Sequence, residues 1–169
     1  RGGMKAVLIA LLMLSVCLPY AGADIRNEPP IPSRPDYAKV IETAIRIELK
    51  KPTGELNKAD LEKVISLNLN HTIMTDAGLK KLPNLKKLTY LRLFSTQITD
   101  EGLKELAKRQ QLTAIDLGLT QITDEGLKEL PKLKQLTLLN LNDTKVTKAE
   151  VAKLRALFPK CRIYSNAKK

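Results

Sequence analysis

LTYLRLFSTQITDEGLKELAKRQQ (88–111) is followed without a gap by LTAIDLGLTQITDEGLKELPKLKQ (112–135), a second copy of the same unit. The frame extends backward to VISLNLNHTIMTDAGLKKLPNLKK (64–87) and forward to LTLLNLNDTKVTKAEVAKLRALFP (136–159). A repeat period in the twenties is typical of solenoids, in which each unit buries its apolar edges against its neighbours. Residues 64–166 are therefore predicted to form a solenoid of about four repeats plus a terminal half-repeat.

The first half of each unit has the alternation of a β-strand. In the second unit Leu91 and Leu93 are predicted to face inward and Arg92 outward, because side chains alternate along a strand. A threonine follows each strand and is placed to bond backbone groups of the turn with its hydroxyl. These threonines are Thr72, Thr96, Thr120 and Thr144.

The second half of each unit has the signals of a short helix. Thr99 and Thr123 are predicted N-caps, with carboxylates in the first turn where the helix dipole favours them. Thr147 and Glu150 have the spacing of a capping box. Apolar residues follow at i and i+3, and Pro83, Pro131 and Pro159 are expected to end three of the helices. Gly102 and Gly126 recur in the first helical turn, which indicates close packing between units.

This alternation of strand and helix resembles the leucine-rich repeat family, and the T-x-I-T-D-E-G-L spelling is similar to bacterial repeats of the ribonuclease-inhibitor type. The resemblance covers about two thirds of the chain. It implies an α/β solenoid with a parallel sheet on the concave face and short helices on the convex side. The run IETAIRIELKKPTGELNKADLEKVISLNL also resembles the amino-terminal caps of internalin-like proteins.

Residues 1–23 have the pattern of a secretory signal peptide. Lys5 precedes the apolar run 6–18, and an A-x-A site ends at Ala23, so we expect cleavage there and a secreted, periplasmic or extracellular protein. The run is too short for a permanent membrane span. Lipid attachment at Cys17 is the alternative, but Val16 stands where a lipoprotein box usually has a small residue. With cleavage after Ala23, Cys161 would be the only cysteine of the mature chain, and it is expected to be buried.

Two segments separate this signal from the repeats. Residues 24–35 contain four prolines and are predicted to be an extended linker. Residues 36–63 are predicted to form a helical cap over the first repeat, with one amphipathic helix capped by Asp36 and a short second helix starting near Asn57.

The formal charge of +11 suggests an anionic partner, and 27 basic against 18 acidic residues still leave +9 after residue 23. Most lysines, however, fall on the helical half of the repeats: Lys80, Lys81, Lys86, Lys87, Lys104, Lys108, Lys128, Lys132 and Lys134. There Asp76–Lys80, Asp100–Lys104 and Asp124–Lys128 have the i, i+4 spacing of solvated ion pairs. Binding of an anionic polymer through this face remains the alternative function.

Catalytic or metal chemistry has little support in the sequence. His71 is the only histidine, and no His, Cys or carboxylate cluster has the spacing of a metal site. The aspartates and glutamates recur at capping positions that already explain them. We therefore expect a protein that is not an enzyme and that uses no cofactor or metal.

The outward strand positions are the residues that the repeat does not dictate. Stacking predicts three rows: Ser66, Tyr90, Ala114, Leu138; Asn68, Arg92, Asp116, Asn140, Tyr164; and Asn70, Phe94, Gly118, Asn142. Arg92 is expected to pair with Asp116 on the next strand, and Gly118 beside Phe94 would leave room for a ligand side chain. Aromatic residues around an arginine are typical of interaction hot spots. We predict non-catalytic recognition of a protein or peptide on this face through Tyr90, Arg92, Phe94, Asp116, Leu138, Asn140 and Tyr164.

Overall fold

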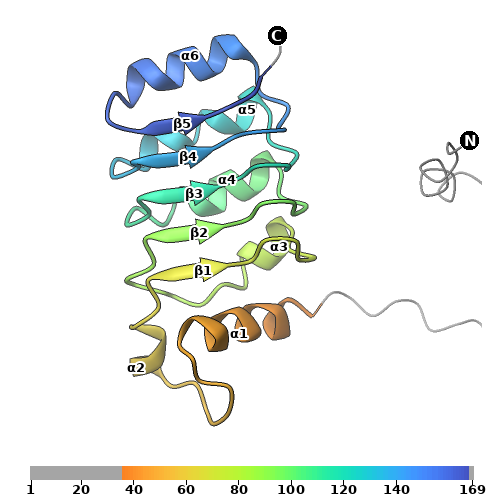
Figure 1. Cartoon of the computed structure of the whole chain (residues 1–169), viewed down its shortest axis with the longest axis vertical. Coiled ribbons are helices and arrows are strands. Elements are labelled where there is room, and N and C mark those ends of the chain that lie inside the picture. Colours follow the sequence, from red (N-terminus) through yellow and green to blue (C-terminus); the bar gives the residue numbers. More distant parts are fainter. Residues whose placement is uncertain (1–35, 168–169) are drawn as a thin grey trace, which may run out of the picture. The chain divides into compact units, whose positions relative to one another are not determined.

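The computed structural model describes residues 36–167, and these form a stack of coils around one parallel sheet (Figure 1). The strands are β1 (Ser66–Asn68), β2 (Tyr90–Arg92), β3 (Ala114–Asp116), β4 (Leu138–Asn140) and β5 (Arg162–Tyr164), paired in sequence order. The predicted leader at 1–23, the lipid alternative at Cys17 and the linker at 24–35 lie outside the described residues.

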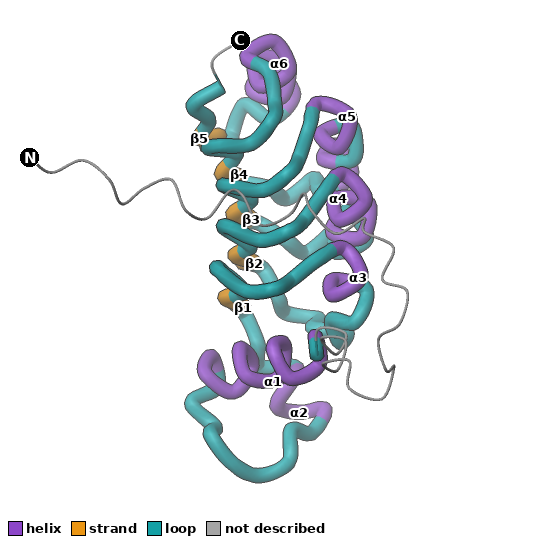
Figure 2. Tube along the Cα trace, turned by 90° about the vertical axis from the view of Figure 1, so that its right-hand side faces the viewer, coloured by secondary structure: helices purple, strands orange, loops and turns teal. Residues whose placement is uncertain are grey.

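Helices cover the side of the stack opposite to the strands (Figure 2). They are α3 (Asp76–Leu79), α4 (Asp100–Leu106), α5 (Asp124–Leu127), the 3-10 turn η2 (Leu130–Lys132) and α6 (Lys148–Leu157). Two further helices, α1 (Tyr37–Glu48) and α2 (Lys58–Leu61), precede the first strand. The predicted α/β leucine-rich repeat solenoid is confirmed.

The core consists of the inward strand residues and the apolar residues of the helical half. Leu67, Leu91, Ile115 and Leu139 occupy one inward row and are fully buried, with Ile163 closing the row at 8% exposure. Cys161 departs from the prediction, because it is only half-buried where the chain enters β5. Partial burial raises the pKa of its thiol by desolvation.

The threonine after each strand closes the turn as predicted. Its hydroxyl donates to the carbonyl oxygen three residues earlier, from Thr96 to Leu93 at 2.6 Å and from Thr120 to Leu117 at 2.6 Å. Thr72 and Thr144 make the same bond in their coils. Thr96 and Thr120 are themselves buried, so the repeated hydroxyl satisfies a backbone acceptor that water cannot reach.

The helix-start aspartates bond to the next coil, which corrects the predicted i, i+4 ion pairs. Asp100 accepts from the Thr123 backbone N–H at 2.8 Å and from the Thr123 hydroxyl at 2.6 Å. Asp76 and Asp124 bind Thr99 and Thr147 in the same way. The aspartates are therefore clamps between coils, which local helix spacing could not reveal.

The convex lysines pair instead with glutamates three residues earlier. Lys108 lies 2.8 Å from Glu105 and Lys153 lies 2.7 Å from Glu150; Lys104, Lys128 and Lys132 pair with Glu101, Glu125 and Glu129. The lysines of these pairs are exposed, whereas Glu105, Glu129 and Glu150 are half-buried. Exposed ion pairs typically contribute about 0–1 kcal/mol each. Hydrogen bonding to Lys108 lowers the pKa of the Glu105 carboxyl, and bonding to Glu101 raises the pKa of the Lys104 amine.

The first coil has no preceding aspartate, and α1 supplies a substitute. The Tyr37 hydroxyl lies 2.8 Å from Thr75 Oγ1, at the position that an aspartate carboxylate occupies in later coils. Ile41, Ala44 and Ile45 bury the apolar side of α1. Its N-cap is Asp36, as expected, and Asn57 caps α2 in a capping box with Asp60.

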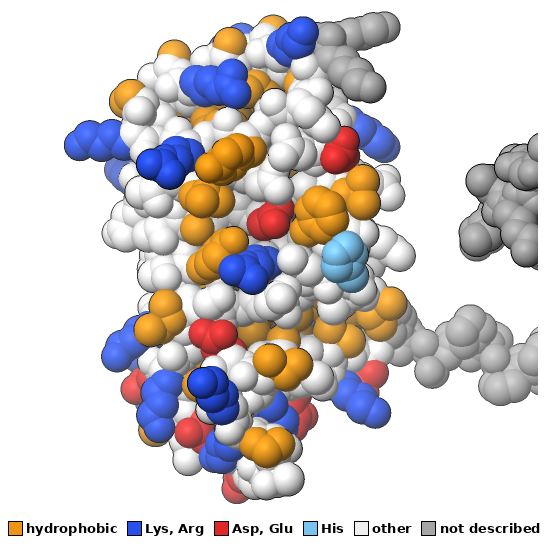
Figure 3. All heavy atoms as spheres, in the orientation of Figure 1, with side chains coloured by type: hydrophobic (Ala, Val, Ile, Leu, Met, Phe, Trp, Pro, Cys, Tyr) orange, Lys and Arg blue, Asp and Glu red, His pale blue; other side chains and the backbone are white. Residues whose placement is uncertain are grey.

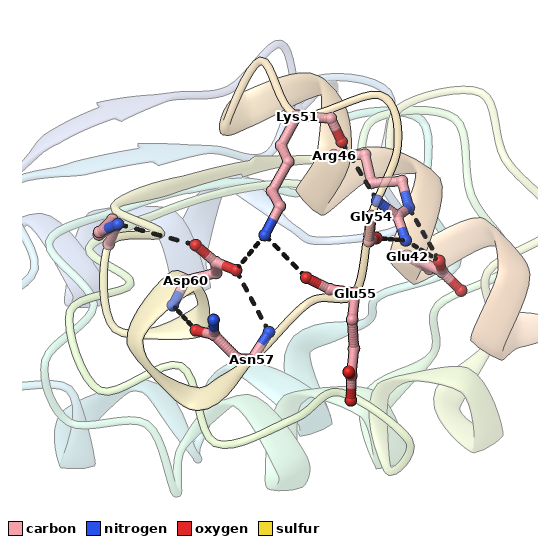
Figure 4. Close-up of polar contacts among 8 residues, drawn as sticks. Glu42, Arg46, Lys51, Gly54, Glu55, Asn57 and Asp60 are labelled. Atoms are coloured by element: carbon pink, nitrogen blue, oxygen red, sulfur yellow. Dashed lines mark hydrogen bonds and ion pairs between the residues drawn. The ribbon is translucent and has the colours of Figure 1, made fainter.

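A polar network joins the loop between α1 and α2 (Figure 4). Asp60 accepts from Lys51 Nζ at 2.7 Å and from the Asn57 backbone N–H at 3.2 Å. Lys51 Nζ also donates to the Glu55 carbonyl at 2.7 Å, and Arg46 donates to the carbonyl of Gly54 at 2.9 Å. The hydrogen bond from Lys51, followed by that from the Asn57 N–H, lowers the pKa of the Asp60 carboxyl below its ordinary value.

Asp60→Asn should make the protein less stable than the parent at pH 7. The stability difference between the two proteins should become smaller in acid. A lowered folded-state pKa stabilises the fold above the ordinary carboxyl pKa of about 3.9 and loses that contribution as the pH falls through the folded value. Melting temperatures of both proteins between pH 7 and pH 2 measure the effect. Glu55→Gln is the control, because its exposed side chain lies outside this network, and it should give parallel curves. If the difference in melting temperature between the parent protein and Asp60→Asn stayed constant with pH, a lowered pKa of Asp60 would be contradicted.

Within residues 36–167, no helix is long and apolar enough to cross a membrane.

Candidate functional site

The outward side chains of the five strands form one continuous face, called the sheet face below. The register places Asn68, Arg92, Asp116, Asn140 and Tyr164 in one row, as predicted. Ser66, Tyr90, Ala114 and Leu138 form the row beside it, which continues to Arg162 on β5. Figure 3 shows apolar side chains on this face around a few charged ones.

Arg92 and Tyr90 form the best-defined contact on the sheet face. The guanidinium carbon of Arg92 lies 4.6 Å from the centre of the Tyr90 ring, within the range of a cation–π interaction. Arg92 Nε is buried and has no hydrogen-bond partner among residues 36–167. The side chain is therefore held by a ring face rather than by an acid.

The predicted Arg92–Asp116 pair does not form, although the two residues are partners in register. Asp116 Oδ1 instead accepts from Asn140 Nδ2 at 2.8 Å and from the Gly118 backbone N–H at 3.1 Å. These neutral donors bind one carboxylate oxygen at short range, and stacking on Tyr90 holds the guanidinium away from it. As a result, no ion pair to Arg92 exists within the described part of the chain.

The space expected beside Gly118 is filled. A Cβ atom at position 118 would stand 2.7 Å from the Phe94 ring and 2.9 Å from Asn140 Nδ2. Phe94 itself meets the ring of His71 edge-on, with ring centres 5.3 Å apart and planes at 72°. Gly118 thus allows Phe94 and Asn140 to approach the backbone, and the prediction of room for a ligand side chain there was wrong.

The remaining predicted residues lie on the face with different exposure. Leu138 and Asn140 are half-buried, whereas Tyr164 is 47% exposed on the terminal strand. Arg162 was missed, although its position follows from adding one period to Leu138. It adds a second cation at the carboxy-terminal end of the face.

One position per coil adopts left-handed backbone geometry at the rim of the sheet face. His71, Ser95, Leu119 and Asp143 have φ values of 54° to 56°. Leu119 is 49% exposed, and a leucine in this conformation is strained because its Cβ crowds the following carbonyl. Sequence reasoning missed this rim because Leu119 lacks the Asn, Asp or Gly identity that usually marks such turns.

No grouping of three or more His, Cys, Asp and Glu side chains able to hold a metal ion occurs in residues 36–167. His71 is exposed and its ring contacts Phe94. The chemistry that the sheet face offers is aromatic stacking, the guanidinium of Arg92 on the Tyr90 ring, and a fixed carboxylate–amide pair.

Comparisons with known proteins agree with this architecture. A family model described as Leucine Rich repeat matches residues 84–107 and 110–130. An internalin of Listeria monocytogenes has a similar structure, with a TM-score of 0.54 and 21% identity over 77% of this chain and 44% of the internalin. This chain therefore spans less than half the length of that protein, and the similarity is one of fold.

Two further solved structures match with lower TM-scores. Internalin C2 of Listeria monocytogenes has a TM-score of 0.36 and 18% identity over 77% of this chain and 85% of its own. A leucine-rich repeat protein of Leptospira interrogans has a TM-score of 0.42 and 26% identity over 64% of this chain and 33% of its own. No curated protein sequence matches the chain significantly.

Proposed function

We propose that this leucine-rich repeat chain is an exported, non-catalytic binding protein that recognises a protein or peptide through its sheet face. In this proposal residues 1–23 direct export and are removed, and residues 36–63 cover the amino-terminal edge of the repeats. The contact residues are those that project from the face: Tyr90, Arg92, Phe94, Asp116, Leu138, Asn140 and Tyr164.

The guanidinium of Arg92 carries the proposal. Arg92 is oriented by an aromatic ring and has no acidic partner in the described chain. Its guanidinium can therefore donate hydrogen bonds to a carboxylate of a binding partner. Its orientation is established before binding, so little side-chain entropy remains to be lost. An acidic side chain or a chain-terminal carboxylate of the partner is the group that this arrangement fits best.

The alternative function is binding of an anionic polymer through the convex lysines. Five of those lysines already lie beside glutamates, which reduces the net positive charge that the helical side presents. A salt titration separates the two proposals. Affinity for a polymer should fall steeply with salt, whereas recognition through an aromatic and arginine cluster should change much less.

Arg92→Ala and Phe94→Ala should each weaken partner binding at least about tenfold while changing the melting temperature little. Neither side chain belongs to the inward rows that form the core, so folding should tolerate both changes. A pull-down with residues 24–169 identifies the partner, and calorimetry with each purified variant gives the affinity.

A convex double change, Lys128→Glu with Lys132→Glu, is the control for charge. It should leave binding at the sheet face intact and impair only a polymer ligand. If this pair abolishes binding while Arg92→Ala and Phe94→Ala have no effect, the sheet-face proposal fails and the polymer alternative replaces it.

A further inference from the structure

Two arginines lie at opposite ends of one row of the sheet face. The row crosses four strands, from β2 to β5, and consists of Tyr90, Ala114, Leu138 and Arg162. The guanidinium of Arg92 also lies at this row, because it stacks 4.6 Å from the centre of the Tyr90 ring. Adjacent strands are ~4.8 Å apart, so about 14 Å separates the β2 and β5 positions of the two arginines.

The surface between the two arginines is apolar. Ala114 and Leu138 are half-buried on β3 and β4, and Figure 3 shows apolar side chains between basic ones on this face. Among the outward positions of the five strands that the structure describes, Asp116 is the only acidic residue. It lies in the neighbouring row, where it would repel a carboxylate placed over Ala114. The middle of the row therefore favours an apolar group, and its two ends favour acids.

We propose that the partner presents to this row an extended peptide segment with two acidic residues four positions apart and an apolar residue midway between them. This inference rests on the proposed function of the sheet face and specifies the chemistry of its partner. One carboxylate binds Arg92 and the other binds Arg162. The apolar side chain between them contacts Ala114 and Leu138.

The geometry of an extended chain matches the row. Side chains at i, i+2 and i+4 project to the same side, and four residues at ~3.3 Å each span about 13 Å. The midpoint of such a segment lies over the boundary between β3 and β4, where Ala114 and Leu138 are register partners. On a helix, residues i and i+4 are only ~6 Å apart, so a helical segment with the same spacing would not reach both arginines.

Both guanidinium groups are available for such a partner. Among residues 36–167, Arg92 and Arg162 form no ion pair with a carboxylate. Hydrogen bonds between a guanidinium and a carboxylate are stronger than neutral ones and are often bidentate. Two of them at a fixed separation would select for the spacing of the acids as well as for their charge.

A pair of synthetic peptides tests the spacing with the full chain. The first is blocked at both ends and has glutamate at its second and sixth positions, leucine at the fourth and serine elsewhere. The second has the same composition, but leucine is at the second position and the glutamates are at the fourth and sixth. Fluorescence anisotropy of labelled peptides should show that the first binds at least about tenfold more tightly, because only it engages both arginines.

Protein variants identify the two contacts. Arg92→Gln and Arg162→Gln should each weaken binding of the first peptide about tenfold and remove its advantage over the second. Lys160→Gln is the matched control, because it removes an exposed charge beside β5 but outside the row, and it should change the affinity little.

Three results would overturn the inference: equal affinities of the two peptides, loss of affinity in Arg92→Gln but not in Arg162→Gln, or equal losses in Lys160→Gln and Arg162→Gln. A further result separates it from the proposed function. If neither peptide binds while a partner isolated by pull-down still depends on Arg92 and Phe94, the acidic extended segment is wrong and recognition through the sheet face stands.

Discussion

Leu117→Ala should lower the free energy of unfolding by about 2–5 kcal/mol, the range observed when leucines are removed from well-packed cores. Leu117 is fully buried in the middle of the stack. Its own turn and the next coil fix the backbone around it, because Thr120 donates to its carbonyl and its own N–H donates to the carbonyl of Asn140. The surrounding coils therefore have little freedom to collapse into the cavity. Urea denaturation followed by circular dichroism measures the loss.

Lys104→Ala is the matched surface change for this experiment. Its ammonium pairs with exposed Glu101 on α4, and removal of such a pair should change stability by no more than about 0.5 kcal/mol. Equal effects of the two substitutions would mean that the inward and outward assignment of the repeat is wrong.

Asp100→Ala should lower the free energy of unfolding by about 2–3 kcal/mol. This loss is far larger than that of an ordinary substitution on a helix surface. The carboxylate binds the backbone N–H and the hydroxyl of Thr123 in the next coil. Hydrogen bonds to charged groups contribute about 1.5–3 kcal/mol, and the partly buried Thr123 N–H would lose its acceptor. The melting temperature and the urea midpoint should both fall.

Gly126→Ala tests the same clamp from its other side. Alanine in place of glycine usually stabilises a helix by about 0.8–1 kcal/mol. Here the new Cβ would stand 2.8 Å from Asp100 Cγ and 3.0 Å from Asp100 Cβ, so α5 and α4 would have to separate. We therefore expect Gly126→Ala to destabilise the protein.

The double variant Asp100→Ala with Gly126→Ala distinguishes a steric clash from other causes. Once the Asp100 carboxylate is removed, an alanine at 126 has more space. Gly126→Ala should therefore lower the free energy of unfolding less in the Asp100→Ala background than in the parent chain. Strictly additive effects would show that the close approach of these two coils does not constrain the glycine.

Much of the fold follows from local periodicity. The 24-residue period specifies one strand and one helix per coil, and the alternation of Leu91, Arg92 and Leu93 specifies which side chain enters the core. Helix starts at Thr99, Thr123 and Thr147 are likewise local, because an N-cap bonds within its own first turn. These features depend on spacings along one chain segment, and the sequence shows those spacings directly.

Partner choice among polar groups depended on the tertiary structure. Asp100 could bond Lys104 in its own helix or Thr123 in the next coil, and the stack brings two donors of Thr123 to within 2.8 Å. Asp116 likewise had Arg92 and Asn140 on either side, and it bonds Asn140 at 2.8 Å while Arg92 stacks on Tyr90. Sequence spacing cannot rank such alternatives, because hydrogen-bond energies change steeply over distances smaller than one residue step.

The sequence by itself determined the repeat, the direction of the strand side chains and the residues of the sheet face. Only the tertiary structure decided that Arg92 stacks on Tyr90 while Asp116 bonds Asn140, that Phe94 fills the space at Gly118, and that α1 leaves an apolar groove beside β1. The physical reason is that alternation and capping are properties of neighbouring residues. Free charges and grooves arise where coils 24 residues apart meet, and their geometry exists only after the stack has formed.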